Sequence, residues 1–335
     1  MNEVNKSTTL AFLIYPGFPM ACLTSAIEPL RAANEIVGQK AFAWQLISET
    51  GGRVSSSAEV GFDPDHALEA ADNVDYLFLL SSPQSKFERP KASEGHLRRL
   101  ARHGVKMGAI SGGVFPLARS GLLSGYKCSV HWCYEAAFAA EFPDHAMTGD
   151  VINIDKNRYT ASGAAAAFDL MLHLIDEKLG QEVTTEVACW FQHPLMRGAG
   201  VRQKTPTVGK KSTSDILPPF VAQAVEIFAS RIADPIAIED VAKAVGVSSR
   251  RIERSFKQAT GQSPSHYYRA LRMNAARQLV LYSKDTMIEI ANAVGYCSAA
   301  PMIRHYKQSF GLSPSEDRKT INIFRVENNS AIPST

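Results

Sequence analysis

The sequence predicts two domains: an α/β N-terminal domain built on a doubly wound parallel sheet, and an all-α C-terminal domain with two helix-turn-helix units. Two observations support this prediction. Short apolar runs alternate with helical patterns over residues 8–195, and a helix-turn-helix pattern occurs twice over residues 215–320. A chain of 335 residues is long enough for two such domains.

Apolar runs and amphipathic stretches alternate along the first domain. In chain order they are a run at Leu10–Tyr15, a helix at about 20–34, runs at Trp44–Ile47 and Tyr76–Leu80, a charged helix at about 94–103 and a run at Val105–Ile110. Short strands that alternate with helices are typical of a parallel sheet covered by helices on both faces. Ligands bind such sheets at the carboxyl ends of the strands.

One strand end carries a distinctive turn. The run at Val105–Ile110 leads directly into Ser111, Gly112 and a second glycine, and then into a helix over residues 114–120. A strand that turns sharply into a helix through small residues has the shape of a nucleophile elbow, with Ser111 at its tip. His131 and Trp132 follow about twenty residues later. We take Ser111, Gly112, His131 and Trp132 as candidate ligand contacts.

The elbow and its surroundings resemble the class I glutamine-amidotransferase-like (PfpI-like) domain, which has a flavodoxin-like sheet. The segments that carry the resemblance are YPGF at 15–18, GLLSG at 121–125, VHW at 130–132 and TASG at 160–163, which leads into a helix at 163–179. Enzymatic members of that superfamily have a cysteine at the elbow, paired with a histidine, whereas this chain has Ser111. The resemblance also places Glu28 where members often carry an acidic residue under the elbow.

We expect no catalysis at this elbow. A serine hydroxyl is a poor nucleophile unless an oriented base takes its proton, and no obvious carboxylate in 121–130 would orient His131. Trp132 is suited to cover the alkyl part of an amino acid or to make a cation–π contact with a quaternary ammonium group. The alternatives remain a serine hydrolase, a packing role for His131 and Trp132, and a solvent-facing Glu28.

The C-terminal part contains an internal repeat. Residues 256–264 (FKQATGQSP) recur as residues 306–314 (YKQSFGLSP), and residues 238–246 (IEDVAKAVG) recur as residues 287–295 (MIEIANAVG). Each copy has an amphipathic helix, a glycine turn and a second helix for which Ser248 or Ser298 is a suitable N-cap. Residues 264–282 read as one connecting helix, about 28 Å long at 1.5 Å per residue, which is close to one DNA turn of about 34 Å.

With both turn glycines and both Gly-x-Ser-Pro ends, residues 215–320 resemble the DNA-binding domain of the AraC/XylS family of bacterial transcription regulators. Carried over residue by residue, the resemblance assigns DNA contacts in the first unit to Arg250, Arg251, Glu253, Arg254 and Lys257, and in the second unit to Ala299, Ala300, Pro301, Arg304 and Lys307. Arginine and glutamate can read bases through paired hydrogen bonds, whereas alanine and proline offer only apolar contacts. A surface ion pair is the alternative role for Arg254.

Charge is distributed unevenly between the two domains. Residues 1–196 carry 16 Lys and Arg against 22 Asp and Glu, and residues 197–335 carry 20 against 11. A basic C-terminal part fits nucleic-acid binding, and an acidic first domain fits a separate sensing role. We place the first domain at 1–196, a Gly-, Ser- and Lys-rich linker at 197–214, the DNA-binding domain at 215–320 and a disordered tail at 321–335.

Five scattered cysteines without Cys-x-x-Cys spacing favour a reduced, cytoplasmic compartment over disulfides or a zinc site. We expect no cofactor, no metal and no membrane span. The two resemblances together imply an effector-responsive activator of a catabolic operon for a small nitrogenous metabolite of the amino acid, carnitine or betaine type. Its expected partners are promoter DNA, a small-molecule effector, RNA polymerase and a second copy of the chain. The alternatives are an amidase or hydrolase tethered to DNA, and an architectural DNA-binding protein with an inert first domain.

Overall fold

The computed structural model describes residues 7–193, 197–198, 200–204 and 217–323. Contacts divide the chain into two compact units, the first extending to Gln203 and the second running from Lys204 to Ile323. The expected linker starts at residue 197, yet its described residues up to Gln203 lie in the first unit, since Arg197 and Gln203 are hydrogen-bonded to it. Residues 205–214 of that linker and 324–335 of the expected tail lie outside the described residues.

The first unit is built on a seven-stranded sheet with the order β10-β11-β7-β6-β1-β2-β5. Neighbouring strands are parallel except for β10, which is antiparallel to β11. The strands are β1 (Thr8–Ile14), β2 (Phe42–Ser48), β5 (His66–Ala67), β6 (Tyr76–Ser81), β7 (Lys106–Ser111), β10 (Ile152–Asp155) and β11 (Arg158–Ala161). The predicted doubly wound α/β sheet is therefore confirmed.

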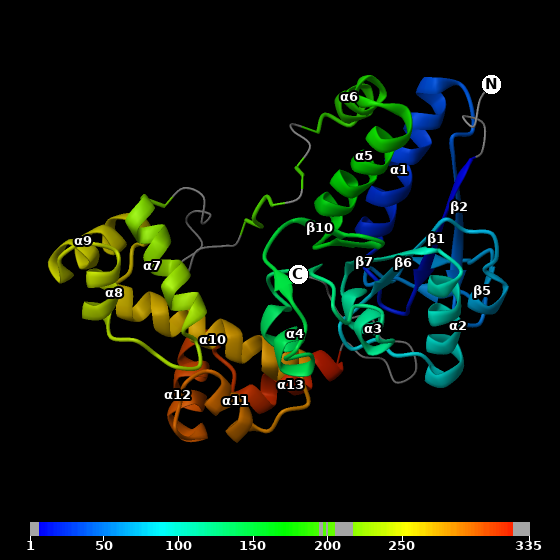
Figure 1. Ribbon diagram of the computed structural model, residues 1–335. Coiled ribbons are helices and arrows are strands. Elements are labelled where there is room, and N and C mark those ends of the chain that lie inside the picture. Colours follow the sequence, from blue (N-terminus) through cyan, green and yellow to red (C-terminus); the bar gives the residue numbers. More distant parts are fainter. Residues whose placement is uncertain (1–6, 194–196, 199, 205–216, 324–335) are drawn as a thin grey trace. The chain divides into compact units, whose positions relative to one another are not determined.

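Helices cover both faces of this sheet (Figure 1). On one face α1 (Met20–Val37) and α5 (Ala164–Leu179) pack on alternate strand residues such as Phe12, and α6 (Gln181–Trp190) packs against both helices. On the other face lie α2 (Pro90–Arg102) and α3 (Val114–Arg119). Because side chains alternate along a strand, central strands that are covered twice read as continuous apolar runs, as Leu10–Ile14 does.

Short elements complete the first unit, and β8 among them positions residues that follow the elbow. They are β3 (Val54–Ser55), β4 (Gly61–Phe62), η1 (Leu68–Ala70), β8 (Cys128–Ser129), α4 (Glu135–Glu141) and β9 (Met147–Thr148). The amide of Ser129 in β8 donates to the Thr160 hydroxyl of β11 at 2.8 Å. This bond brings the chain that follows β8, including His131, to the edge of the sheet where β11 ends.

The second unit is helical in all its described secondary structure. Its helices are α7 (Pro219–Ser230), α8 (Ile238–Ala244), α9 (Ser249–Thr260), α10 (Pro264–Tyr282), α11 (Met287–Ala293), α12 (Ala299–Phe310) and α13 (Pro314–Ile323). The pairs α8–α9 and α11–α12 are the two helix-turn-helix units, and α10 is the connecting helix. Gly246 and Gly295 have φ of 71° and 74°, a left-handed conformation that favours glycine in the two turns.

The two recognition helices begin differently. The Ser248 side chain accepts a hydrogen bond from the amide of Arg251, as expected of an N-cap. Ser298 is the N-cap residue of α12, as predicted, but its side chain makes no capping hydrogen bond. The turn ahead of α12 is held instead by Arg272 of α10, whose Nε and Nη2 donate to the carbonyls of Val294 and Gly295 at 2.7 Å each.

Candidate effector site and DNA-binding helices

Ser111 lies at a strained position at the end of β7. Its φ is 55°, which is uncommon for a residue other than glycine, and the residue is buried. The chain passes from β7 through this residue into α3 with only Gly112 and Gly113 between. A left-handed serine at a sharp turn from strand to helix has the geometry of a nucleophile elbow.

Gly112 and Gly113 allow the elbow to lie against β6. A Cβ at Gly112 would lie 2.3 Å from the Ser81 carbonyl oxygen, and one at Gly113 would lie 1.9 Å from the Leu79 carbonyl oxygen. Any side chain at either position would collide with backbone. The structure therefore explains Gly112 by packing, whether or not a ligand also touches it.

Hydroxyl side chains occupy the carboxyl ends of four adjacent strands. The four residues in register at these ends are Ile14, Leu80, Ile110 and Ala161, and each is followed by a hydroxyl residue: Tyr15, Ser81, Ser111 and Ser162. The hydroxyls of Tyr15 and Ser81 are buried and have no hydrogen-bond partner among the described residues. Buried polar groups are normally paired, so a ligand or water at this edge would satisfy them. Neither was predicted as a site residue, although Tyr15 is the last residue of one predicted run and Ser81 directly follows another.

His131 is a neutral ring between two aromatic neighbours. Its Nδ1 lies 2.8 Å from Cys133 Sγ, and its ring centroid lies 5.5 Å from those of Trp132 and Tyr134. Burial lowers the pKa of His131 to about 4 and raises the pKa of the Cys133 thiol to about 12. Both groups are therefore uncharged at neutral pH, and the pair is no thiolate–imidazolium ion pair. None of the five cysteines forms a disulfide.

His131 and Ser111 reach the same edge of the sheet without bonding. A Cβ on Gly163, at the start of α5, would lie 3.3 Å from His131 Cδ2, which places the imidazole beside the end of β11. β11 pairs with β7, the strand that ends at Ser111. No hydrogen bond joins the Ser111 hydroxyl to His131 among the described residues.

The lowered pKa of His131 predicts a pH dependence of stability. Between about pH 6.5 and pH 4 the unfolded chain binds a proton at His131 that the folded chain does not, so folding stability is lost as pH falls through this window. We expect His131→Gln to reduce that loss by about 2 kcal/mol, allowing for the partial exposure of the ring. Urea unfolding from pH 7 to pH 4 measures it, with exposed His103→Gln as the matched control. Identical pH slopes in the wild type and His131→Gln would contradict the prediction.

Glu28 is held by α1 itself. Its carboxylate pairs with Arg31 Nε at 2.9 Å, and its side chain is 44% exposed. Among the described residues it forms no hydrogen bond or ion pair with Ser111 or His131. The structure thus places it as the solvent-facing alternative describes.

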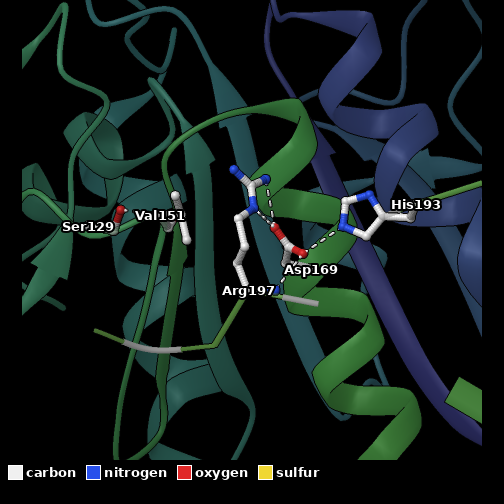
Figure 2. Close-up of polar contacts among 5 residues, drawn as sticks. All are labelled: Ser129, Val151, Asp169, His193 and Arg197. Carbon is white, nitrogen blue, oxygen red and sulfur yellow. Dashed lines mark hydrogen bonds and ion pairs between the residues drawn. The ribbon is translucent and has the colours of Figure 1, made fainter. Parts of the chain in front are cut away.

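A buried carboxylate that is not among the predicted site residues anchors the chain after α6. Asp169 of α5 is fully buried, and it accepts from His193 Nε2 at 2.8 Å and from Arg197 Nε at 2.8 Å (Figure 2). The amide of Arg197 also donates to it at 3.0 Å. The available signal was a single acidic residue within the apolar stretch 164–175. This cluster holds the first described residue of the expected linker on the first unit.

The first recognition helix, α9, exposes its charged residues. Arg250, Glu253, Arg254 and Lys257 are exposed and form no ion pair with any described residue. This geometry removes the ion-pair alternative for Arg254 within the described structure. Arg251 differs, because its guanidinium lies over the Phe220 ring of α7, 5.3 Å from the centroid.

The second recognition helix, α12, has fewer exposed polar side chains at the predicted positions. Ala300, Arg304 and Lys307 are exposed, whereas Ala299 and Pro301 are half-buried. Met302 and Tyr306 form its buried side. Arg304 and Lys307 are thus the charged groups of the predicted set that this helix presents.

The described residues show neither a metal-binding cluster nor a membrane-spanning helix. They contain no cluster of three His, Cys, Asp or Glu residues arranged to hold a metal ion. No helix in the described part of the chain combines the length and apolarity needed to cross a membrane.

Comparison with known proteins decides the family. The DJ-1/PfpI family model matches residues 12–177, and a helix-turn-helix domain model matches residues 241–320. The HTH-type transcriptional regulator GbdR of Pseudomonas aeruginosa is 33% identical over 311 residues, which are 93% of this chain and 84% of that protein. The chain belongs to the AraC-type transcriptional regulators with an N-terminal DJ-1/PfpI domain. Both resemblances drawn from the sequence are confirmed.

Two further proteins agree with this membership. The HTH-type transcriptional regulator ArgR of Pseudomonas aeruginosa is 32% identical over 315 residues, which are 92% of each chain. The crystal structure of an AraC family transcriptional regulator from Pseudomonas putida matches with a TM-score of 0.51 and 25% identity, over 55% of this chain and 99% of that one. This AraC-type regulator is accordingly a DNA-binding transcription regulator, as the names of both Pseudomonas aeruginosa relatives indicate for those proteins.

Proposed function

We propose that the first unit senses a small nitrogenous metabolite of the amino acid, carnitine or betaine type, and thereby controls promoter binding by the second unit. The observation that supports this most directly is that a neutral His131 lies beside the tilted ring of Trp132, near the strand ends that carry the four hydroxyl residues. An aromatic face attracts a quaternary ammonium or guanidinium group, and an uncharged imidazole does not repel it. Hydroxyl donors suit the carboxylate at the other end of such a metabolite.

We also propose that this unit is not an enzyme. A serine nucleophile requires a base within hydrogen-bond reach, and the described Ser111 hydroxyl has no such partner. The neighbouring Cys133 is a buried thiol whose pKa is raised to about 12, so it supplies no thiolate. The left-handed elbow at Ser111 is the one observation that favours the hydrolase alternative.

The test combines ligand binding with a search for hydrolysis. Glycine betaine, L-carnitine and L-arginine are titrated into the full-length protein, and a ligand at a hundredfold excess over its Kd stabilises the fold by about 2.7 kcal/mol. Trp132→Ala should weaken binding at least tenfold, and Ser111→Ala by about fivefold, the worth of one hydrogen bond of about 1 kcal/mol. Unchanged affinities in both variants would remove this edge as the site. Amide or ester hydrolysis that disappears in Ser111→Ala would establish the enzyme instead.

The remaining assignments follow from this role. We propose a cytoplasmic homodimer that activates transcription through RNA polymerase once the effector is bound. Promoter contacts are proposed for the exposed residues of α9 and α12, with Arg250, Glu253 and Arg254 reading bases and Lys257 and Lys307 contacting phosphates. Sedimentation of the full-length protein with and without effector tests the dimer.

A further inference from the structure

The last described residues of the first unit pair with the segment between β9 and β10. The amide of Val151 donates to the Val201 carbonyl at 2.7 Å, and the amide of Gln203 donates to the Gly149 carbonyl at 2.8 Å. Between these bonds, Asp150 and Arg202 form an antiparallel bridge. Residues 201–203, which we call the strap, therefore lie along 149–151 as an added strand would.

The side chain of Gln203 continues from the strap to the candidate effector loop. Its Oε1 accepts from the amide of Trp132 at 2.9 Å, and its Nε2 donates to the Val130 carbonyl at 2.7 Å and to the Asp150 carbonyl at 3.1 Å. Two of these bonds hold the backbone on either side of His131. Only a side chain that both donates and accepts can make this set, which an amide does with one planar group.

Arg197, a few residues before the strap, is held more strongly than Gln203 is. Arg197 is held by the buried carboxylate of Asp169 through charge-assisted hydrogen bonds, whereas Gln203 is held by neutral bonds to backbone groups. Charge-assisted bonds are roughly twice as strong as neutral ones. The hydrogen bonds of Gln203 are accordingly the ones that respond to a ligand at the effector loop, while Arg197 stays in place on Asp169.

We propose that Gln203 is a positioning residue that couples the effector site to DNA binding. The proposal rests on the proposed function, in that the effector contacts His131 and Trp132. An effector that orders Val130–Trp132 also orders Gln203, and the next residue, Lys204, opens the second unit. Ligand binding and the conformation of the chain entering the DNA-binding unit are thereby linked through one side chain.

The experiment measures coupling rather than affinity alone. Full-length wild type, Gln203→Ala and the control Gln181→Ala, an exposed glutamine of α6, are titrated with glycine betaine in the presence and absence of a DNA site selected in vitro with the wild type. Coupling between two sites typically changes affinity by about 5- to 150-fold, and reciprocally. We expect saturating glycine betaine to change the affinity for DNA by this factor in the wild type and in Gln181→Ala, but by less than twofold in Gln203→Ala. If Gln203→Ala only weakened glycine betaine binding, saturating ligand would restore the full effect on DNA affinity.

A second variant and a second measurement test the same proposal if Gln203→Ala does not fold or glycine betaine does not bind. If Gln203→Ala fails to fold, Gln203→Glu replaces it, because a carboxylate keeps the acceptor for the Trp132 amide but loses both donors. If the wild type does not bind glycine betaine, that choice of effector fails, and the coupling is judged by amide hydrogen exchange of residues 128–134. Adding DNA should then change this exchange in the wild type and Gln181→Ala but not in the Gln203 variant. Equal coupling in all three proteins, or no change of exchange in the wild type, overturns the proposal.

Discussion

Replacing Gly113 with alanine is expected to destabilise the first unit by about 3 kcal/mol or more. A Cβ at residue 113 would lie 1.9 Å from the carbonyl oxygen of Leu79 and 3.1 Å from that of Ile110. Both atoms belong to the backbone of paired central strands, β6 and β7, and cannot rotate away as the end of a flexible side chain can. The elbow would have to move off the sheet, and the left-handed Ser111 would move with it.

Gly95→Ala is the matched control. Gly95 lies within α2, and a Cβ there would meet no heavy atom within 4 Å. Alanine is favoured over glycine in a helix interior, so this variant should be more stable than the wild type by up to about 1 kcal/mol. Chemical unfolding followed by circular dichroism compares the three proteins. Similar unfolding midpoints for Gly113→Ala and the wild type would show that the elbow does not lie against β6 as described.

Arg250→Ala and Arg254→Ala are each expected to relax base preference in one half-site by about 5- to 150-fold, which corresponds to about 1–3 kcal/mol per base-reading pair. Both side chains are exposed on α9 and have no ionic partner among the described residues, so their guanidinium groups are available to bases. α12 offers Arg304 as the one comparable group at its predicted positions. The first unit should therefore define its half-site more sharply than the second.

Site selection in vitro and salt titration measure this division of roles. Lys307→Ala should weaken binding to all sequences alike and lower the salt slope by about one phosphate, because a lysine on a phosphate carries no base information. Arg251→Ala is the matched arginine control, since its guanidinium already lies over Phe220. We expect Arg251→Ala to change base preference less than either reading arginine does. A selected sequence in which the second half-site is the better defined would contradict this assignment.

Much of the fold could be read from local pattern. The connecting helix was predicted over 264–282 and spans Pro264–Tyr282, and the strand ahead of the elbow was predicted over 105–110 and spans Lys106–Ser111. Helix periodicity, turn glycines and apolar runs depend on neighbours within a few residues, so they are visible without the tertiary structure. Ser298 was predicted as an N-cap on the same local grounds and occupies that position, but its side chain makes no capping bond, and Arg272 of α10 donates to the turn ahead of it.

Contacts between distant residues could not be read in this way. Asp169 meets Arg197, 28 residues away, and Gln203 meets the Trp132 amide, 71 residues away. For the same reason, the first unit extends to Gln203, although the linker was predicted to start at residue 197. The Gly-rich, aperiodic sequence of this stretch carries no sign of the Asp169 carboxylate or of the backbone groups that hold residues 197–203. The pKa of His131, and hence its neutrality, depends on burial that no local pattern encodes.

The amino-acid sequence by itself determined the class of this protein: a parallel α/β unit, a duplicated helix-turn-helix and the elbow at Ser111 all follow from spacing and residue type over short windows. The tertiary structure alone decided which hydroxyls share the strand edge with Ser111, that Glu28 pairs with Arg31 rather than with the elbow, and that the strap returns to Val130 and Trp132. The physical reason is that folding brings together side chains far apart in sequence, and their burial and hydrogen bonds exist only once the whole unit has packed.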